Sequence, residues 1–169
     1  MGLLYAEPMS SEVSDGLSRL GGVIFRVCGC EDYSFLPATI AVKVIPVPKM
    51  AEIPGSPPEL RGVALVDGDM IPIVEVWGDY APPSTEEGNA MLVCVVLGEA
   101  VGLVGIEVIA TGAFESIRTE SEAEIRVRVP PRPHEDVEAA DLIVARPEEA
   151  AIFDVGAVIG RVREGRWAV

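Results

Sequence analysis

Short apolar runs separated by Gly- and Pro-containing turns recur along the chain, and they predict strands rather than long helices. Val and Ile dominate these runs, and β-branched side chains fit a pleated sheet. The predicted strands span residues 23–27, 33–36, 42–45, 62–65, 70–76, 91–97, 101–106, 125–129, 142–145 and 151–153. Many short strands joined by turns indicate an all-β fold, either a barrel or a sandwich.

Gly, Pro and Asp residues mark the connections between these strands. Asp67-Gly68 is typical of a two-residue hairpin turn, and Gly98-Glu99 joins the next pair of strands. Pro37 can start a single helical turn through Thr39. Asp154 can cap a short helix that ends near Val162. Loops are predicted at residues 29–32, 54–58, 79–90 and 130–138, and residues 79–90 are the predicted boundary between two subdomains.

Composition and charge narrow the class of protein. The net charge is −14, with 49% hydrophobic and only 5% aromatic residues. An acidic chain repels nucleic-acid phosphates and anionic membrane surfaces, so neither is expected as a partner. Residues 1–21 do not resemble a signal peptide and predict a flexible tail, with a short frayed helix over residues 11–20 as the alternative. The chain has no apolar run of about 18 residues, and we expect a cytoplasmic protein.

Cysteine and histidine give little sign of chemistry. Cys28 and Cys30 are spaced i, i+2, so on a strand they would share one face, and they do not form a CxxC motif. Together with Cys94 they are interpreted as small buried hydrophobic residues in a reducing compartment. His134 is the only histidine and is interpreted as a solvated loop residue.

No catalytic or cofactor-binding motif stands out. The sequence contains no zinc-ligand spacing, phosphate-binding glycine loop or nucleophile elbow. Asp67 and Asp69 could suggest a calcium loop, but the rest of the EF-hand ligand series is missing and a turn fits better. We therefore expect a binding module with no cofactor and no metal, rather than an enzyme.

Residues 57–76, PPELRGVALVDGDMIPIVEV, closely resemble the signature of the CheW-like family of chemotaxis coupling proteins. The similarity extends more loosely from about residue 23 to 162. It implies two intertwined SH3-like five-stranded β-barrels with short helices, one of them near the C-terminus. Residues 22–169 would form a single CheW-like domain. Its subdomain 1 would comprise about 28–80 plus 150–169, and its subdomain 2 about 22–27 plus 88–149.

The resemblance also implies a function and two binding surfaces. The chain would be a non-enzymatic adaptor that couples chemoreceptors to a CheA-like histidine kinase in a two-component pathway, and would be recruited to receptor arrays. The implied receptor-binding residues are Lys43, Arg61, Gly62 and Asp67. The implied surface for the regulatory domain of the kinase contains Val95, Leu97, Val101 and Val108. A buried strand core is the alternative interpretation of Val95, Leu97 and Val101.

This sequence departs from the family pattern at Lys43 and Asp67, where the family usually carries Glu and Arg. We therefore expect an ion pair of reversed polarity between Lys43 and Asp67, across neighbouring strands. The departures favour one alternative function, a regulatory module that binds only one of the two partners. A small ligand-binding barrel unrelated to signalling is a further alternative, and it would require a deep pocket with converging carboxylates.

Overall fold

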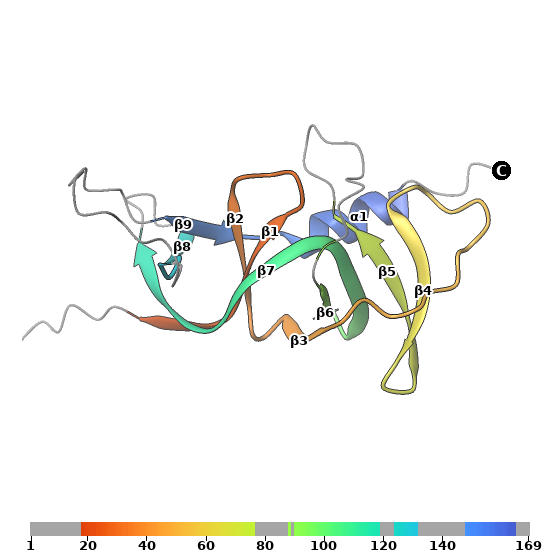
Figure 1. Cartoon of the computed structure of the whole chain (residues 1–169), viewed down its shortest axis with the longest axis horizontal. Helices are drawn as coiled ribbons and strands as arrows, with labels where there is room; N and C mark the ends of the chain where they lie inside the picture. Colours follow the sequence, from red (N-terminus) through yellow and green to blue (C-terminus); the bar gives the residue numbers. More distant parts are fainter. Residues whose placement is uncertain (1–17, 77–87, 89, 119–123, 132–147, 165–169) are drawn as a thin grey trace, which may run out of the picture.

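The computed structural model describes residues 18–76, 88, 90–118, 124–131 and 148–164. Its described part is mostly β-structure with one short helix, as the apolar pattern predicts (Figure 1). The elements are β1 (Arg19–Val27), β2 (Tyr33–Pro37), β3 (Ala41–Ile45), β4 (Leu60–Val66), β5 (Asp69–Glu75), β6 (Ala90–Val96), β7 (Glu99–Arg118), β8 (Ile125–Arg128), β9 (Glu149–Ile152) and α1 (Val155–Glu164). His134 and the strand predicted at residues 142–145 lie outside the described residues.

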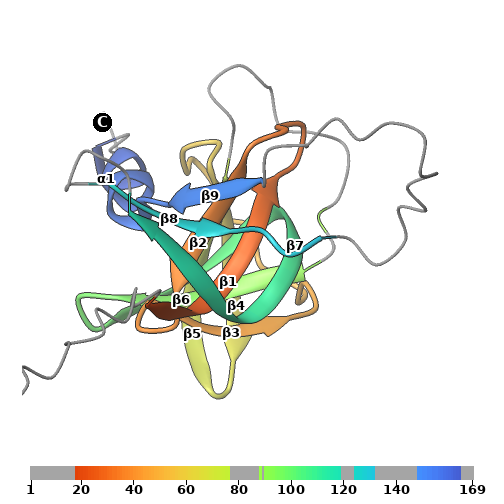
Figure 2. The ribbon, with the colours of Figure 1, turned by 90° about the vertical axis from the view of Figure 1, so that its left-hand side faces the viewer.

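The strands pair in two closed circuits that share β7. In the first circuit β1 pairs with β2, β2 with β9, β9 with β8, β8 with β7, and β7 with β1. In the second circuit β3 pairs with β6, β6 with β7, β7 with β5, and β5 with β4. A bridge between Ala51 and Val63 joins the segment after β3 to β4 and closes this circuit. The circuits lie at opposite ends of an elongated molecule (Figure 1), and Figure 2 views it from the end with β8 and β9 of the first circuit.

Strand β7 is much longer than the sequence pattern predicts. Its first part pairs with β5 and β6, and its later part pairs with β1 and β8. The predicted strand ends at residue 106, whereas β7 continues to Arg118. Positive φ angles at Gly105 (76°) and Gly112 (145°) let the chain bend while its hydrogen bonding continues.

Strand β1 begins four residues earlier than predicted. Arg19 to Gly22 pair with Glu115 to Gly112 of β7, so the alternative of a helix reaching Leu20 is wrong for the described residues. Pairing with β7 holds this segment in a strand, although its two adjacent glycines do not favour a strand by themselves. After β2, Ile40 N donates to the carbonyl oxygen of Pro37 at 2.9 Å, and residues 38–40 form a turn instead of the predicted helical turn.

Two tight hairpins have the same backbone geometry. Asp67 and Gly68 have φ angles of 53° and 95°, and Leu97 and Gly98 have φ angles of 52° and 81°. Two consecutive positive φ values define the type I′ turn that fits the twist of antiparallel strands. The Asp67-Gly68 prediction is confirmed, whereas the second turn lies one residue earlier than Gly98-Glu99 because Leu97 adopts the left-handed conformation.

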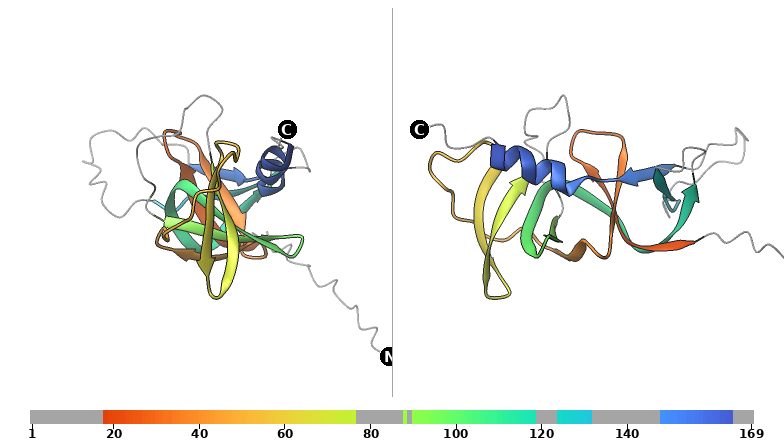
Figure 3. Two further views of the ribbon diagram at one scale, coloured as in Figure 1. Left: turned by 90° about the vertical axis from the view of Figure 1, so that its right-hand side faces the viewer. Right: turned by 180° about the vertical axis from the view of Figure 1, so that it is seen from behind.

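Three apolar clusters form the core. The first circuit encloses a cluster that includes Ile24 and Phe35, and the second encloses one that includes Ile73 and Met91. The largest cluster joins strands of both circuits to α1 through Val155 and Val158. Helix α1 follows β9 and lies alongside the second circuit (Figure 3). The predicted cap is confirmed, since Ala157 N donates to Asp154 Oδ1 at 2.9 Å.

Cys94 is fully buried in the largest cluster, as expected for a small hydrophobic residue. Burial raises the pKa of its thiol from 9.0 to about 12. The unfolded chain therefore releases this proton at a lower pH than the native protein does, which favours unfolding as the pH rises from 9 to 12. We expect Cys94 to lower the free energy of unfolding by roughly 1.4 kcal/mol per pH unit in that window.

This contribution can be isolated by measuring denaturant unfolding between pH 8 and 11 for the wild type and for Cys94→Ala. The stability difference between the two proteins should shrink as the pH rises, because alanine cannot titrate. A difference that stays constant across the range would contradict a protonated, buried thiol.

None of the helices in the described part of the chain is long and apolar enough to cross a membrane.

Candidate protein-binding site

The β4–β5 hairpin, formed by residues 57–76 of the motif, is the centre of the candidate site. Its inner face is buried against the core of the second circuit through Ala64, Val66, Ile71 and Ile73. Val63 pairs with Pro72 and Leu65 pairs with Met70, so these four apolar residues share the outer face. Leu65 is 67% exposed and Met70 is 71% exposed. Neighbouring apolar residues left open to solvent are typical of a surface that binds another protein.

The tip of this hairpin projects from the second circuit (Figures 1 and 3). An ion pair joins the tip to β3. Lys43 Nζ of β3 donates to Asp67 Oδ2 in the β4–β5 turn, which confirms the expected pair. The two side chains are 38% and 69% exposed, so the pair contributes only about 0–1 kcal/mol to stability. Strand β3 is paired with β6 and not with β4 or β5. The ion pair therefore joins the β4–β5 turn to a strand to which the hairpin strands are not hydrogen-bonded.

The other end of β4 is fixed by a second ion pair and by a close backbone contact. Arg61 Nη1 donates to Glu75 Oε2 at 3.0 Å, and the Glu75 side chain is only 9% exposed. Gly62 has a φ of 148° and lies against Ala51, where a Cβ atom would be 2.2 Å from the Ala51 carbonyl oxygen. The buried Glu75 carboxylate needs a cationic partner such as Arg61, because an uncompensated charge inside a protein is costly.

The predicted receptor-binding residues therefore form two groups rather than one. Lys43 and Asp67 meet at the hairpin tip, whereas Arg61 and Gly62 lie at the base. Arg61 and Asp67 are separated by six residues of extended chain, or roughly 20 Å at 3.3 Å per residue. The Arg61 side chain is also committed to Glu75. Lys43 and Asp67 are therefore the pair best placed to act together at a surface, and the receptor-binding role of all four residues stays a prediction.

The four predicted kinase-binding residues do not form one exposed patch. Val101 is 2% exposed and belongs to the largest core cluster, which also contains Val155 and Val158 of α1. The prediction of a surface role for Val101 is therefore wrong. Val95 and Val108 are partly buried, and Leu97 is 97% exposed at the tip of the β6–β7 hairpin. Val108 lies further along β7, where that strand pairs with β1.

The β6–β7 hairpin is tied to the helix by a further ion pair. Arg163 Nη2 of α1 donates to Glu99 Oε2 beside the turn that carries Leu97. Both side chains are well exposed, so the contact orients the hairpin more than it stabilises the fold. The Arg163–Glu99 ion pair thus links α1 to the hairpin that presents Leu97.

Two features of the site were not identified from the sequence. The sequence predicts that Leu65 supplies the core together with Val63, Ile71, Ile73 and Val76, and this is wrong for Leu65, which is 67% exposed on the outer face beside Met70. Strict alternation on a two-stranded hairpin leaves one face without a covering element. Glu75 was not singled out either. Its signal was present, since a lone carboxylate in an otherwise apolar run needs a cation nearby, and Arg61 is the cation across the hairpin.

Comparisons with known proteins find similarity among solved structures. No family model matches the chain, and no curated protein matches it. Among solved structures, the crystal structure of the scaffolding protein TtCheW from Thermoanaerobacter tengcongensis is similar, with a TM-score of 0.49 and 17% sequence identity. The match covers 92% of this chain and 91% of that one. Because both measures of similarity are low, the function proposed below rests on this chain's own residues.

Proposed function

We propose that this chain is a non-enzymatic, cytoplasmic signalling adaptor of the CheW type. Its two strand circuits would correspond to two SH3-like barrels, and it would couple a chemoreceptor to a CheA-like histidine kinase. The observation that carries the proposal is the β4–β5 hairpin. The motif that resembles the family signature forms a projecting hairpin with an apolar outer face and charged residues at its tip. Such a surface suits binding to another protein.

The proposal assigns each partner a surface. The receptor tip would bind beside Lys43 and Asp67, and the regulatory domain of the kinase would bind the hairpin that presents Leu97. Charged residues on a projecting element contribute mainly to specificity, because a wrong partner places like charges together. A partner matched to Lys43 and Asp67 would therefore differ in charge from one that recognises the usual Glu and Arg.

The test is a binding assay with purified full-length chain, the kinase regulatory domain and a receptor cytoplasmic fragment from the same genome. Asp67→Lys places two cations together at the hairpin tip and is expected to weaken receptor binding at least tenfold, or about 1.4 kcal/mol. Kinase binding should be unchanged. Asp69→Lys, at the neighbouring position in the same turn, is the matched control for a simple change in net charge.

The outcome separates three cases. Equal weakening by both substitutions would indicate a general charge effect and would contradict a specific role for the Lys43–Asp67 pair. Failure of the wild-type chain to bind either partner would overturn the adaptor function. Binding to the kinase without formation of a ternary complex would favour the second candidate, a regulatory module with one partner, for which the reversed polarity at Lys43 and Asp67 is the supporting observation.

A further inference from the structure

Met70 lies on the outer face of the β4–β5 hairpin, two residues after Gly68 of its turn. The next residue along β5, Ile71, is buried in the core cluster of the second circuit. Because successive side chains of a strand point to opposite faces, the Met70 side chain is directed away from that core. Met70 is 71% exposed, so its thioether is open to small molecules in solution.

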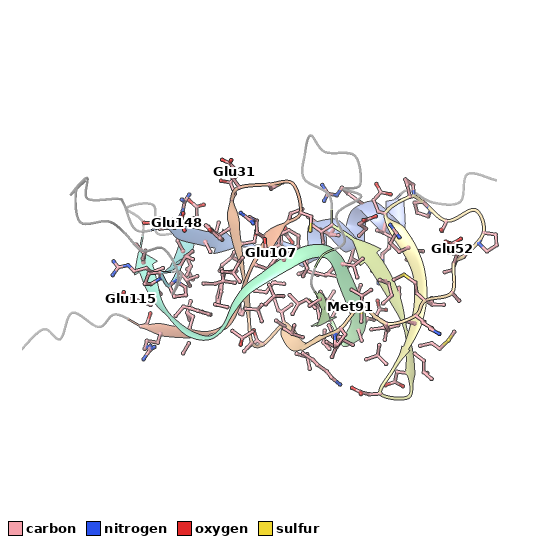
Figure 4. The ribbon with its side chains drawn as sticks, in the orientation of Figure 1. Glu31, Glu52, Met91, Glu107, Glu115 and Glu148 are labelled. Carbon is pink, nitrogen blue, oxygen red and sulfur yellow. The ribbon has the colours of Figure 1, made fainter. Side chains whose placement is uncertain are left out.

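The other methionines in the described part of the chain are shielded by the core. Met91 of β6 is fully buried in the cluster of the second circuit, and Figure 4 shows it among the strands of that circuit. Met50 is partly buried and packs against the same cluster. Met1 and Met9 lie outside the described residues. Of the described methionines, Met70 is therefore the one that a reagent in solution reaches most easily.

Met70 and Leu65 form an exposed apolar pair next to the charged tip of the hairpin. They are register partners on β5 and β4, and opposite side chains of such a pair have Cβ atoms about 4.5–5.5 Å apart. Leu65 is separated from Asp67 by two residues of chain, or about 7 Å when extended. A partner that binds beside Lys43 and Asp67 is thus also able to cover Leu65 and Met70.

The thioether of Met70 suits this position and can also be altered there. Methionine is flexible and polarisable, so it adapts its shape to the surface of a partner. Oxidation converts the apolar thioether into a polar sulfoxide. A sulfoxide oxygen that is buried in an apolar contact without a hydrogen-bond donor costs free energy. The oxidation state of one side chain thus decides whether this face favours or opposes binding.

The acidic tip does not protect Met70 from oxidation. Asp67 and Asp69 are both exposed and would repel an anionic reagent, whereas hydrogen peroxide is neutral. A thioether has no proton to lose, so its reaction does not depend on the pKa of a neighbouring group. Exposure of the sulfur is therefore the property that sets the reactivity of Met70.

We propose that Met70 is a redox-sensitive contact residue of the receptor-binding surface, which hydroperoxides inactivate by forming its sulfoxide. This inference rests on the proposed function. The Met70 sulfur attacks one peroxide oxygen with a lone pair, and an S–O bond forms as the O–O bond breaks. The hydroxide that leaves takes the remaining proton from the new S–OH group and becomes water. Methionine sulfoxide reductases reverse the change, while two thiols are oxidised to a disulfide and water is released.

The rate of oxidation of each methionine tests the accessibility of Met70. The folded full-length chain is treated briefly with hydrogen peroxide and cleaved after glutamate, which places Met70 and Met91 in separate peptides because Glu75 lies between them. Met70 should gain one oxygen atom roughly tenfold faster than Met91, since exposure governs this reaction. The same treatment in denaturant should remove the difference. Equal rates in the folded chain would overturn the proposal.

Receptor binding before and after oxidation tests the consequence. The oxidised wild type should bind the receptor cytoplasmic fragment about tenfold more weakly than the untreated chain, because a polar sulfoxide replaces the apolar contact. Treatment with methionine sulfoxide reductases and a thiol should restore the affinity. Met70→Gln, which places a polar side chain of similar length at this position, should bind weakly without any peroxide.

Met70→Leu is the matched control, because leucine keeps the outer face apolar but has no thioether. Peroxides also oxidise cysteine thiols, so the control must retain them. Cys28 and Cys30 follow the end of β1 and are only partly buried, so the expectation that both are buried is wrong. Met70→Leu keeps both cysteines and should bind the receptor fragment equally well before and after treatment.

The outcomes separate this proposal from the adaptor function on which it rests. Failure of the untreated wild type to bind the receptor fragment would overturn the adaptor function and this proposal with it. Binding that survives full oxidation of Met70, or an equal loss of binding in Met70→Leu, would overturn this proposal alone. Loss of the strand signal in circular dichroism on oxidation would also overturn it, because the effect would then be on the fold.

Discussion

Replacement of Gly62 with alanine is expected to lower the free energy of unfolding by about 4 kcal/mol or more. Gly62 has a φ of 148°, and a Cβ atom there would lie 2.2 Å from the Ala51 carbonyl oxygen and 2.9 Å from its carbon. Ala51 cannot move aside easily, because it is held to Val63 by two backbone hydrogen bonds of 2.8 and 2.9 Å. Those hydrogen bonds close the second circuit, so relief of the clash would open it.

Gly55→Ala is the matched control for this experiment. Gly55 also has a positive φ, 76°, but no heavy atom lies within 4 Å of the position that its Cβ would take. The control should cost only about 1 kcal/mol, which is the conformational preference of glycine alone. Chemical denaturation monitored by circular dichroism gives both values. Similar costs for the two variants would contradict the contact between Gly62 and Ala51.

Replacement of Phe35 with alanine is expected to cost about 3–5 kcal/mol. Phe35 is fully buried in the first circuit, and its ring packs edge-on against Phe114 with centroids 6.0 Å apart. The ring occupies space that only a glycine leaves free, because a Cβ on Gly22 would lie 2.6 Å from it. Strand β2 lies between β1 and β9, so the resulting cavity would affect both strand pairings.

The measurement is the same denaturation experiment, with Val42→Ala as the control. Val42 is an apolar strand residue that is 59% exposed, and its truncation should change stability by no more than about 0.5 kcal/mol. A Phe35→Ala variant as stable as the Val42→Ala variant would show that the first circuit does not depend on this core. Loss of the α1 helix signal at the same denaturant concentration as the sheet signal would indicate that the whole chain unfolds together.

Much of the fold could be predicted from the sequence because local signals and tertiary structure agree. Asp67-Gly68 is a turn by local preference and is a turn in the structure, and Asp154 caps the helix as its position suggests. The length of β7 could not be predicted, because residues 107–118 are held by β1 and β8, which are distant in sequence. Strand extension depends on such partners more than on intrinsic preference.

The candidate site could be predicted only in part, for a similar reason. The Lys43–Asp67 pair was expected from the family pattern, and the two side chains do meet. The burial of Val101 and the exposure of Leu97 could not be separated by alternation, because the intervening turn places Leu97 in a left-handed conformation.

The sharing of β7 has a consequence for synthesis on the ribosome. All strands of the second circuit lie within residues 41–106, so that part of the nascent chain can fold as soon as it has emerged. The first circuit combines residues 19–37 with residues 125–152, so its earliest strands must wait for its latest ones. Domains usually acquire structure from the N-terminus onward during translation. Here the middle of the chain can fold first, and Phe25 and Phe35 stay available to chaperones until β9 has been made.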